Sequence, residues 1–149
     1  PNLIDLVGEF GTSLGLNYQI YDDLIDTFGN DSYFGKTLGS DLQTGKLTLP
    51  IIRLLEVLPK ESRLSLKSDF IHGDFNLDFK KYLGQLFIEY NIHEICFSEL
   101  ESRLSISKFI ASNIPDLKLS ARLTSFISSF DNKLGKLASN LLPNFLALN

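Results

Sequence analysis

Apolar residues recur at steps of three and four along most of the chain, which is the pattern of amphipathic helices. The first run extends from Leu3 to Phe28 and predicts one long helix, with Gly29 at its end. Its apolar positions are Leu3, Leu6, Val7, Phe10, Leu14, Tyr18, Tyr21, Leu24, Ile25 and Phe28. No segment of the sequence alternates as a strand does, so the pattern predicts an all-α protein.

The next stretch, residues 29–47, shows no strand-like alternation and contains the turn formers Gly29, Asn30, Gly35, Gly39 and Gly45. It is therefore expected to be a long loop, and long loops in compact domains tend to be functional. A helix should follow, with Thr48 as its cap, Pro50 in its first turn and its end near Leu58.

The second half of the chain predicts three more helices. One covers residues 79–90 and is closed by Asn91 in a left-handed conformation. Another extends to Asn113, where Ile114 and Pro115 break it. The last has its apolar face over residues 119–137, and its pattern stops at Pro143. Between these helices and the first half, residues 59–76 are expected to hold a short helix and turns around Gly73.

Composition narrows the class of protein. The chain has 149 residues, 44% of them hydrophobic and 21% charged, as expected for a single globular domain. A net charge of −4 and the absence of a Lys/Arg run argue against a nucleic-acid partner. One cysteine excludes a disulfide scaffold, and no apolar run approaches the ~18 residues of a membrane span. We therefore expect a cytoplasmic protein that is not integral to a membrane.

Three aspartates stand at the end of the first predicted helix. Asp22 and Asp26 are four residues apart and share one helix face, with Asp23 on its flank. Unpaired carbonyl groups make a helix end negative, and like charges at this spacing repel. A bound cation would remove this conflict, and oxygen ligands alone favour Mg²⁺ or Ca²⁺ over zinc.

Two lysines, Lys36 and Lys46, follow on the predicted loop and are suited to binding phosphate oxygens. Mg²⁺ is commonly held by one or two carboxylates together with substrate phosphates. The combination predicts a metal and diphosphate site. By itself, however, a DDxxD motif is more often a solvated acidic helix end beside a flexible loop.

The sequence "YQIYDDLID", followed by "GKTLGSDLQTGKLTLP", resembles the second aspartate-rich motif of the trans-isoprenyl (polyprenyl) diphosphate synthases. The similarity is dense from Gly15 to Pro50 and becomes weaker through about residue 133. Tyr18 stands where the family usually has Phe. The resemblance implies an antiparallel all-α bundle of the isoprenoid synthase type. It also implies condensation of isopentenyl diphosphate with an allylic diphosphate, and a homodimer.

The resemblance also assigns roles to individual residues. Asp22 would hold a Mg²⁺ that bridges to the allylic diphosphate, with Asp23 and Asp26 ligating or supporting the metal. Gln19 would lie beside the allylic substrate, while Lys36 and Lys46 would bind its diphosphate. Asp22 and Lys36 are thus the candidate catalytic residues.

The family's first aspartate-rich motif and its upstream basic residues have no counterpart in this sequence. The chain also begins with Pro1 and contains no methionine. We therefore expect residues 1–149 to be one all-helical domain that forms the carboxyl-terminal part of a larger one, with little turnover alone. Two alternatives stay open, a non-catalytic subunit that retains the fold and a helical domain with an incidental acidic patch. A second aspartate-rich motif upstream would favour the enzyme.

Overall fold

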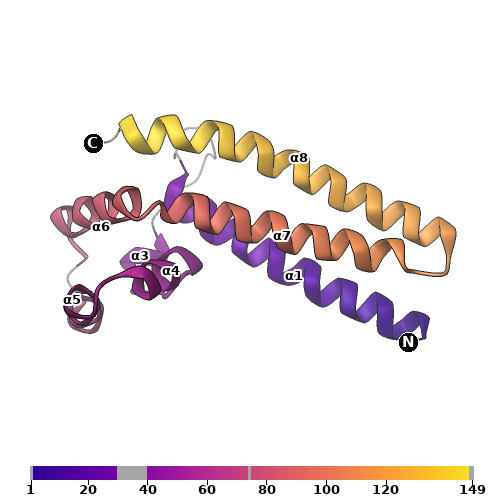
Figure 1. The fold of residues 1–149 in the computed structure, drawn as a ribbon, viewed down its shortest axis with the longest axis horizontal. Coiled ribbons are helices and arrows are strands. Elements are labelled where there is room, and N and C mark those ends of the chain that lie inside the picture. Colours follow the sequence, from indigo (N-terminus) through magenta and orange to yellow (C-terminus); the bar gives the residue numbers. More distant parts are fainter. Residues whose placement is uncertain (1, 30–39, 74, 148–149) are drawn as a thin grey trace. The chain divides into compact units, whose positions relative to one another are not determined.

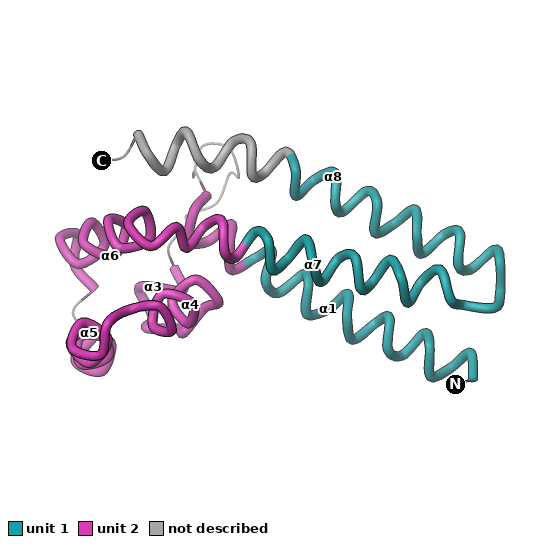
Figure 2. Tube along the Cα trace, in the orientation of Figure 1, with its two compact units in different colours: residues 1–22, 97–140 teal, residues 23–96, 141–149 magenta. Residues whose placement is uncertain are grey.

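The computed structural model describes residues 2–29, 40–73 and 75–147, and this part of the chain contains seven helices and no strand (Figure 1). The all-α class predicted from the sequence is thus confirmed. The chain divides into two compact units, residues 1–22 with 97–140 and residues 23–96 with 141–149 (Figure 2). The single domain expected over residues 1–149 stays a prediction.

The first helix, α1 (Leu3–Phe28), has the length that its apolar spacing predicts and contributes to both units. The division falls between Asp22 and Asp23. A continuous helix therefore carries the whole aspartate motif.

Unit 1 contains the first part of α1 together with most of α7 (Ile92–Ser112) and the part of α8 (Leu117–Ala147) up to residue 140. Within this unit α7 runs antiparallel to the other two helices (Figure 1). α7 ends where Ile114 and Pro115 predicted its end. Buried apolar side chains from all three helices form the core, among them Phe10, Ile20, Leu100, Leu104, Ile127 and Phe130.

The expectation that the last helix stops at Pro143 is wrong, because α8 continues to Ala147. Proline removes one backbone donor and crowds only the preceding turn. Helix-forming residues on both sides can therefore extend the helix through it.

Unit 2 contains the end of α1, α3 (Ser40–Gln43), α4 (Leu49–Val57), α5 (Lys60–His72) and α6 (Leu77–Glu89). The predicted helices over 48–58 and 79–90 correspond to α4 and α6, and Asn91 has the predicted positive φ of 50°. Gly73 ends α5 in the left-handed conformation with φ 74°.

Two expectations for unit 2 need correction. Residues 40–43 form a short helix within the segment predicted as a loop, and α5 is a regular helix of 13 residues rather than a short one. Only Leu66 of α5 is buried, so apolar spacing carries little signal there. Its Lys, Glu, Arg and Leu residues nevertheless favour helix intrinsically.

No helix in the described part of the chain is both long enough and apolar enough to cross a membrane.

A buried polar cluster joins α1 and α7 inside unit 1. The Ser107 hydroxyl is fully buried, lies 2.6 Å from the Ser13 hydroxyl and accepts a hydrogen bond from the Asn17 side-chain amide at 2.8 Å. Buried polar groups are stable only when they are paired. Ser107 therefore fixes how these two helices pack.

We predict that Ser107→Ala lowers the free energy of unfolding by about 1 to 3 kcal/mol, because the buried Asn17 amide loses its acceptor. Urea denaturation monitored by circular dichroism measures the change. Ser105→Ala is the matched control, since this exposed hydroxyl only donates to the Glu101 carbonyl of the same helix. Equal losses in the two variants would contradict the prediction.

Candidate metal and diphosphate site

The carboxyl-terminal turns of α1 are fixed in unit 2 by apolar packing. Leu24 is fully buried, and the Phe28 ring packs edge-on against Phe87 with centroids 5.4 Å apart. This packing sets the rotation of the helix about its axis, and so sets where the neighbouring aspartates point. Asp23 and Asp26 are each only 7% exposed, whereas Asp22 is exposed.

Asp26 binds the first turn of α3. Its Oδ2 accepts the backbone N–H of Asp41 at 3.0 Å, and its Oδ1 accepts the Ser40 hydroxyl at 3.2 Å. The first amide groups of a helix have no partner within the helix. Asp26 therefore acts as a cap for α3 from another helix.

Asp23 has the same relation to α4. Its Oδ2 accepts the backbone N–H of Leu49, the first residue of α4, at 3.2 Å. Thr48 occupies the N-cap position that the sequence predicts, with φ −77° and ψ 166°, but its side chain makes no capping hydrogen bond. The capping carboxylate instead comes from α1, 26 residues earlier in the chain.

Lys46 lies between two of the acidic side chains. Its ammonium donates to Asp41 Oδ2 at 2.7 Å and to Asp23 Oδ1 at 3.3 Å, while 44% of its side chain stays exposed. The hydrogen bond to Asp41 raises the pKa of Lys46 above its ordinary 10.5, and the charge of Asp23 adds to this against partial burial. Lys46 is therefore a firmly charged ammonium close to the aspartate motif.

The remaining predicted site residues are only partly covered by the structure. Gln19 is exposed on α1, and Lys36 lies outside the described residues. Among the residues described, no three His, Cys, Asp or Glu side chains come together as a metal site. Asp23 and Asp26 bind the 40–49 segment, and Lys46 of that segment contacts Asp23. Asp22, which precedes Asp23 in the sequence, is exposed.

Ser40 and Asp41 are not among the site residues predicted from the sequence. Both lie in the quoted motif, and a Ser-Asp pair directly after a glycine is a helix-start signal. That signal could have revealed α3. It could not have revealed the partner on α1, because nothing local connects Asp26 with residues 40 and 41.

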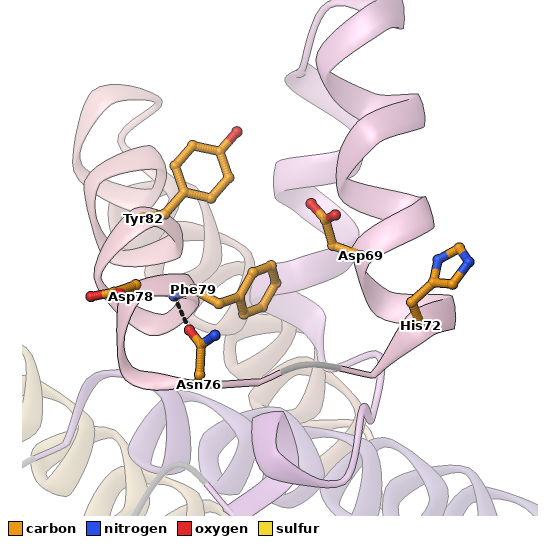
Figure 3. A pocket seen from close by; sticks show the side chains of 6 residues that line it. All are labelled: Asp69, His72, Asn76, Asp78, Phe79 and Tyr82. Carbon is orange, nitrogen blue, oxygen red and sulfur yellow. Dashed lines mark hydrogen bonds between the residues drawn. The ribbon is translucent and has the colours of Figure 1, made fainter.

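A separate pocket lies in unit 2 between the end of α5 and the start of α6 (Figure 3). It has a volume of about 390 Å³ and is lined by Asp69, His72, Asn76, Asp78, Phe79 and Tyr82. Asn76 caps α6, since its side-chain oxygen accepts the Phe79 N–H at 2.9 Å. None of the predicted site residues lines this pocket.

The aspartate motif and the 40–49 segment lie in a part of the chain that matches a known protein family. Residues 1–78 match the family model for polyprenyl synthetase, which is just over half of the chain and includes α1, α3 and α4. The chain belongs to the polyprenyl synthetase family. The family predicted from the sequence is thereby confirmed, and the helices of the chain belong to the isoprenoid synthase type of all-α fold.

Individual proteins that are similar to this chain have names that fit the same family. A short chain isoprenyl diphosphate synthase of Methanothermobacter thermautotrophicus is 35% identical over 77 residues, which are 52% of this chain and 24% of that protein. The chloroplastic solanesyl diphosphate synthase 1 of Arabidopsis thaliana is 40% identical over 70 residues, 47% of this chain and 17% of that protein. A geranylgeranyl diphosphate synthase of Sulfolobus acidocaldarius is 35% identical over 68 residues, 45% and 21% of the two chains.

The matched part of this chain thus spans about a quarter or less of the length of these relatives. No solved structure matches it significantly.

The raised pKa of Lys46 predicts a loss of stability at alkaline pH. Its contribution is fully present below the ordinary value of 10.5 and is lost as the pH rises through the higher folded-state value. Because the side chain is partly exposed, we expect only a few tenths of a kcal/mol. Urea unfolding of wild type and Lys46→Met between about pH 9 and 12 should show their difference shrinking; a difference that grows with pH would contradict the assignment.

Proposed function

We propose that this chain carries the metal- and diphosphate-binding part of a prenyltransferase that condenses isopentenyl diphosphate with an allylic diphosphate. The observation that carries the proposal is the contact between the aspartate helix and the lysine segment. Lys46 donates to Asp23 across 23 residues of sequence, within the stretch that matches the family. A cation beside an acidic helix end is the arrangement that a metal–diphosphate complex needs.

The side chains fit a magnesium ion at Asp22. Its carboxylate supplies the hard oxygen that Mg²⁺ prefers, and Mg²⁺ normally completes its shell with waters and substrate phosphates. Asp23 and Asp26 already accept hydrogen bonds from backbone amides of the 40–49 segment. Asp22 is exposed, whereas Asp23 and Asp26 are each only 7% exposed, and this difference in exposure supports Asp22 as the ligand and the other two aspartates as its support.

When bound, magnesium would neutralise the charge that develops on the diphosphate as the allylic C–O bond breaks. The residues of the chain have complementary tasks. Lys46, with Lys36, would bind diphosphate oxygens as point charges. Gln19, one helical turn before Asp22, would contact the allylic substrate beside that group.

The proposal has three further parts, which concern the metal, the oligomeric state and the location of the protein. Magnesium as the metal, a homodimer and a cytoplasmic location are all compatible with the family. The names of the matched relatives describe synthases of isoprenyl, solanesyl and geranylgeranyl diphosphate, which favours the enzyme over a non-catalytic subunit.

We predict that Mg²⁺ and pyrophosphate together raise the melting temperature of the chain. A ligand at about 100 times its dissociation constant stabilises the folded state by about 2.7 kcal/mol, or about 5 to 10 °C at this size. Differential scanning fluorimetry should show this rise for wild type and lose it in Asp22→Ala.

The matched control is Glu9→Ala, which removes an exposed carboxylate from the same helix. This variant should keep the full rise. No rise in wild type, or an equal rise in Asp22→Ala, would refute the proposed site.

A further inference from the structure

The backbone of Lys46 is fixed by the end of α3. The Gly45 amide donates to the Leu42 carbonyl at 3.0 Å, and the Lys46 amide donates to the Asp41 carbonyl at 2.9 Å. These two bonds form a Schellman turn, in which Gly45 takes the left-handed conformation with φ +68°. Lys46 is thereby attached to Asp41 through its main chain.

A cluster of three aromatic rings packs against this turn at Gly45. A Cβ atom at Gly45 would lie 3.2 Å from the Phe75 ring, so a larger residue would require the ring to shift and would itself have to adopt a positive φ. Phe75 itself packs edge-to-face with Phe70 and Phe79, with ring centroids 5.4 and 5.7 Å away. The turn that presents Lys46 therefore rests against a packed surface.

The side chain of Lys46 is held by the same residue as its backbone. Its ammonium lies 2.7 Å from the Asp41 carboxylate, and Asp41 is in turn held by Asp26 through its own N–H. An ammonium has three donors, and Asp41 and Asp23 accept two of them. With 44% of the side chain exposed, the ammonium remains accessible to a ligand.

We infer that Asp41 is a positioning residue that orients the Lys46 ammonium toward the diphosphate, and that Asp26 fastens this pair to the motif helix. The inference rests on the proposed function, in which Lys46 binds diphosphate. It adds Asp41 to the residues of the proposed site and gives Asp26 a role that does not involve binding the metal.

Two roles of Asp41 predict changes of opposite sign. If Asp41 contributed only negative charge, its removal would tighten the binding of an anion. If it orients Lys46, its removal weakens binding, because a flexible lysine loses side-chain freedom when it binds. The backbone bonds of residue 41 to Asp26 and Lys46 do not need its side chain, so Asp41→Ala keeps the turn.

The experiment is a double-mutant cycle, with pyrophosphate titrated calorimetrically into the full chain in saturating Mg²⁺. Lys46→Met should weaken binding about tenfold, as expected for the loss of a charged hydrogen bond. Asp41→Ala should also weaken binding severalfold. In the Asp41→Ala background, Lys46→Met should cost less than about threefold, since the two side chains act together.

The matched control removes the aspartate of another lysine–aspartate ion pair, Lys108–Asp131 in unit 1. Asp131→Ala should leave pyrophosphate affinity unchanged, and circular dichroism should show that all variants are folded. Tighter binding by Asp41→Ala, or an undiminished tenfold cost of Lys46→Met, would overturn this inference alone. Failure of wild type to bind would overturn the proposed function as well.

Discussion

The candidate site depends on two carboxylates of α1 that accept hydrogen bonds from backbone amides in the first turns of other helices. Asp26 binds the start of α3, and Asp23 binds the start of α4. Each bond satisfies a donor that its own helix leaves unpaired. Together they fasten residues 40–49 to the aspartate helix, so the lysine of that segment comes to lie beside the motif.

The same contacts explain how the helix end tolerates three aspartates. The end of a helix is negative, and neighbouring carboxylates repel there. Amide groups at the starts of α3 and α4 and the Lys46 ammonium offset the charge of Asp23 and Asp26. Asp22 is exposed and is the aspartate that the proposal assigns to magnesium. One motif thus combines the proposed ligand with two residues that bind the 40–49 segment.

Thr48 and Pro50 predicted α4, and apolar spacing predicted α1, α6, α7 and most of α8, because each of the latter helices buries one face. It failed for α5, which buries only Leu66, and for α3, which has no buried residue. The aspartates and Lys46 could be identified from their spacing and the family resemblance. The hydrogen-bond partners of Asp23 and Asp26 could not, because they depend on tertiary packing between segments that are 15 to 26 residues apart.

The central claim is that Asp22 binds the metal, while Asp23 and Asp26 bind backbone amides of the 40–49 segment. A crystal structure of the chain with Mg²⁺ and pyrophosphate tests it most directly. We predict an Asp22 carboxylate oxygen about 2.0 to 2.1 Å from the magnesium ion. Asp23 and Asp26 should keep their bonds to the Leu49 and Asp41 amides. A magnesium ion bound by Asp23 or Asp26, with those amide bonds broken, would contradict the account.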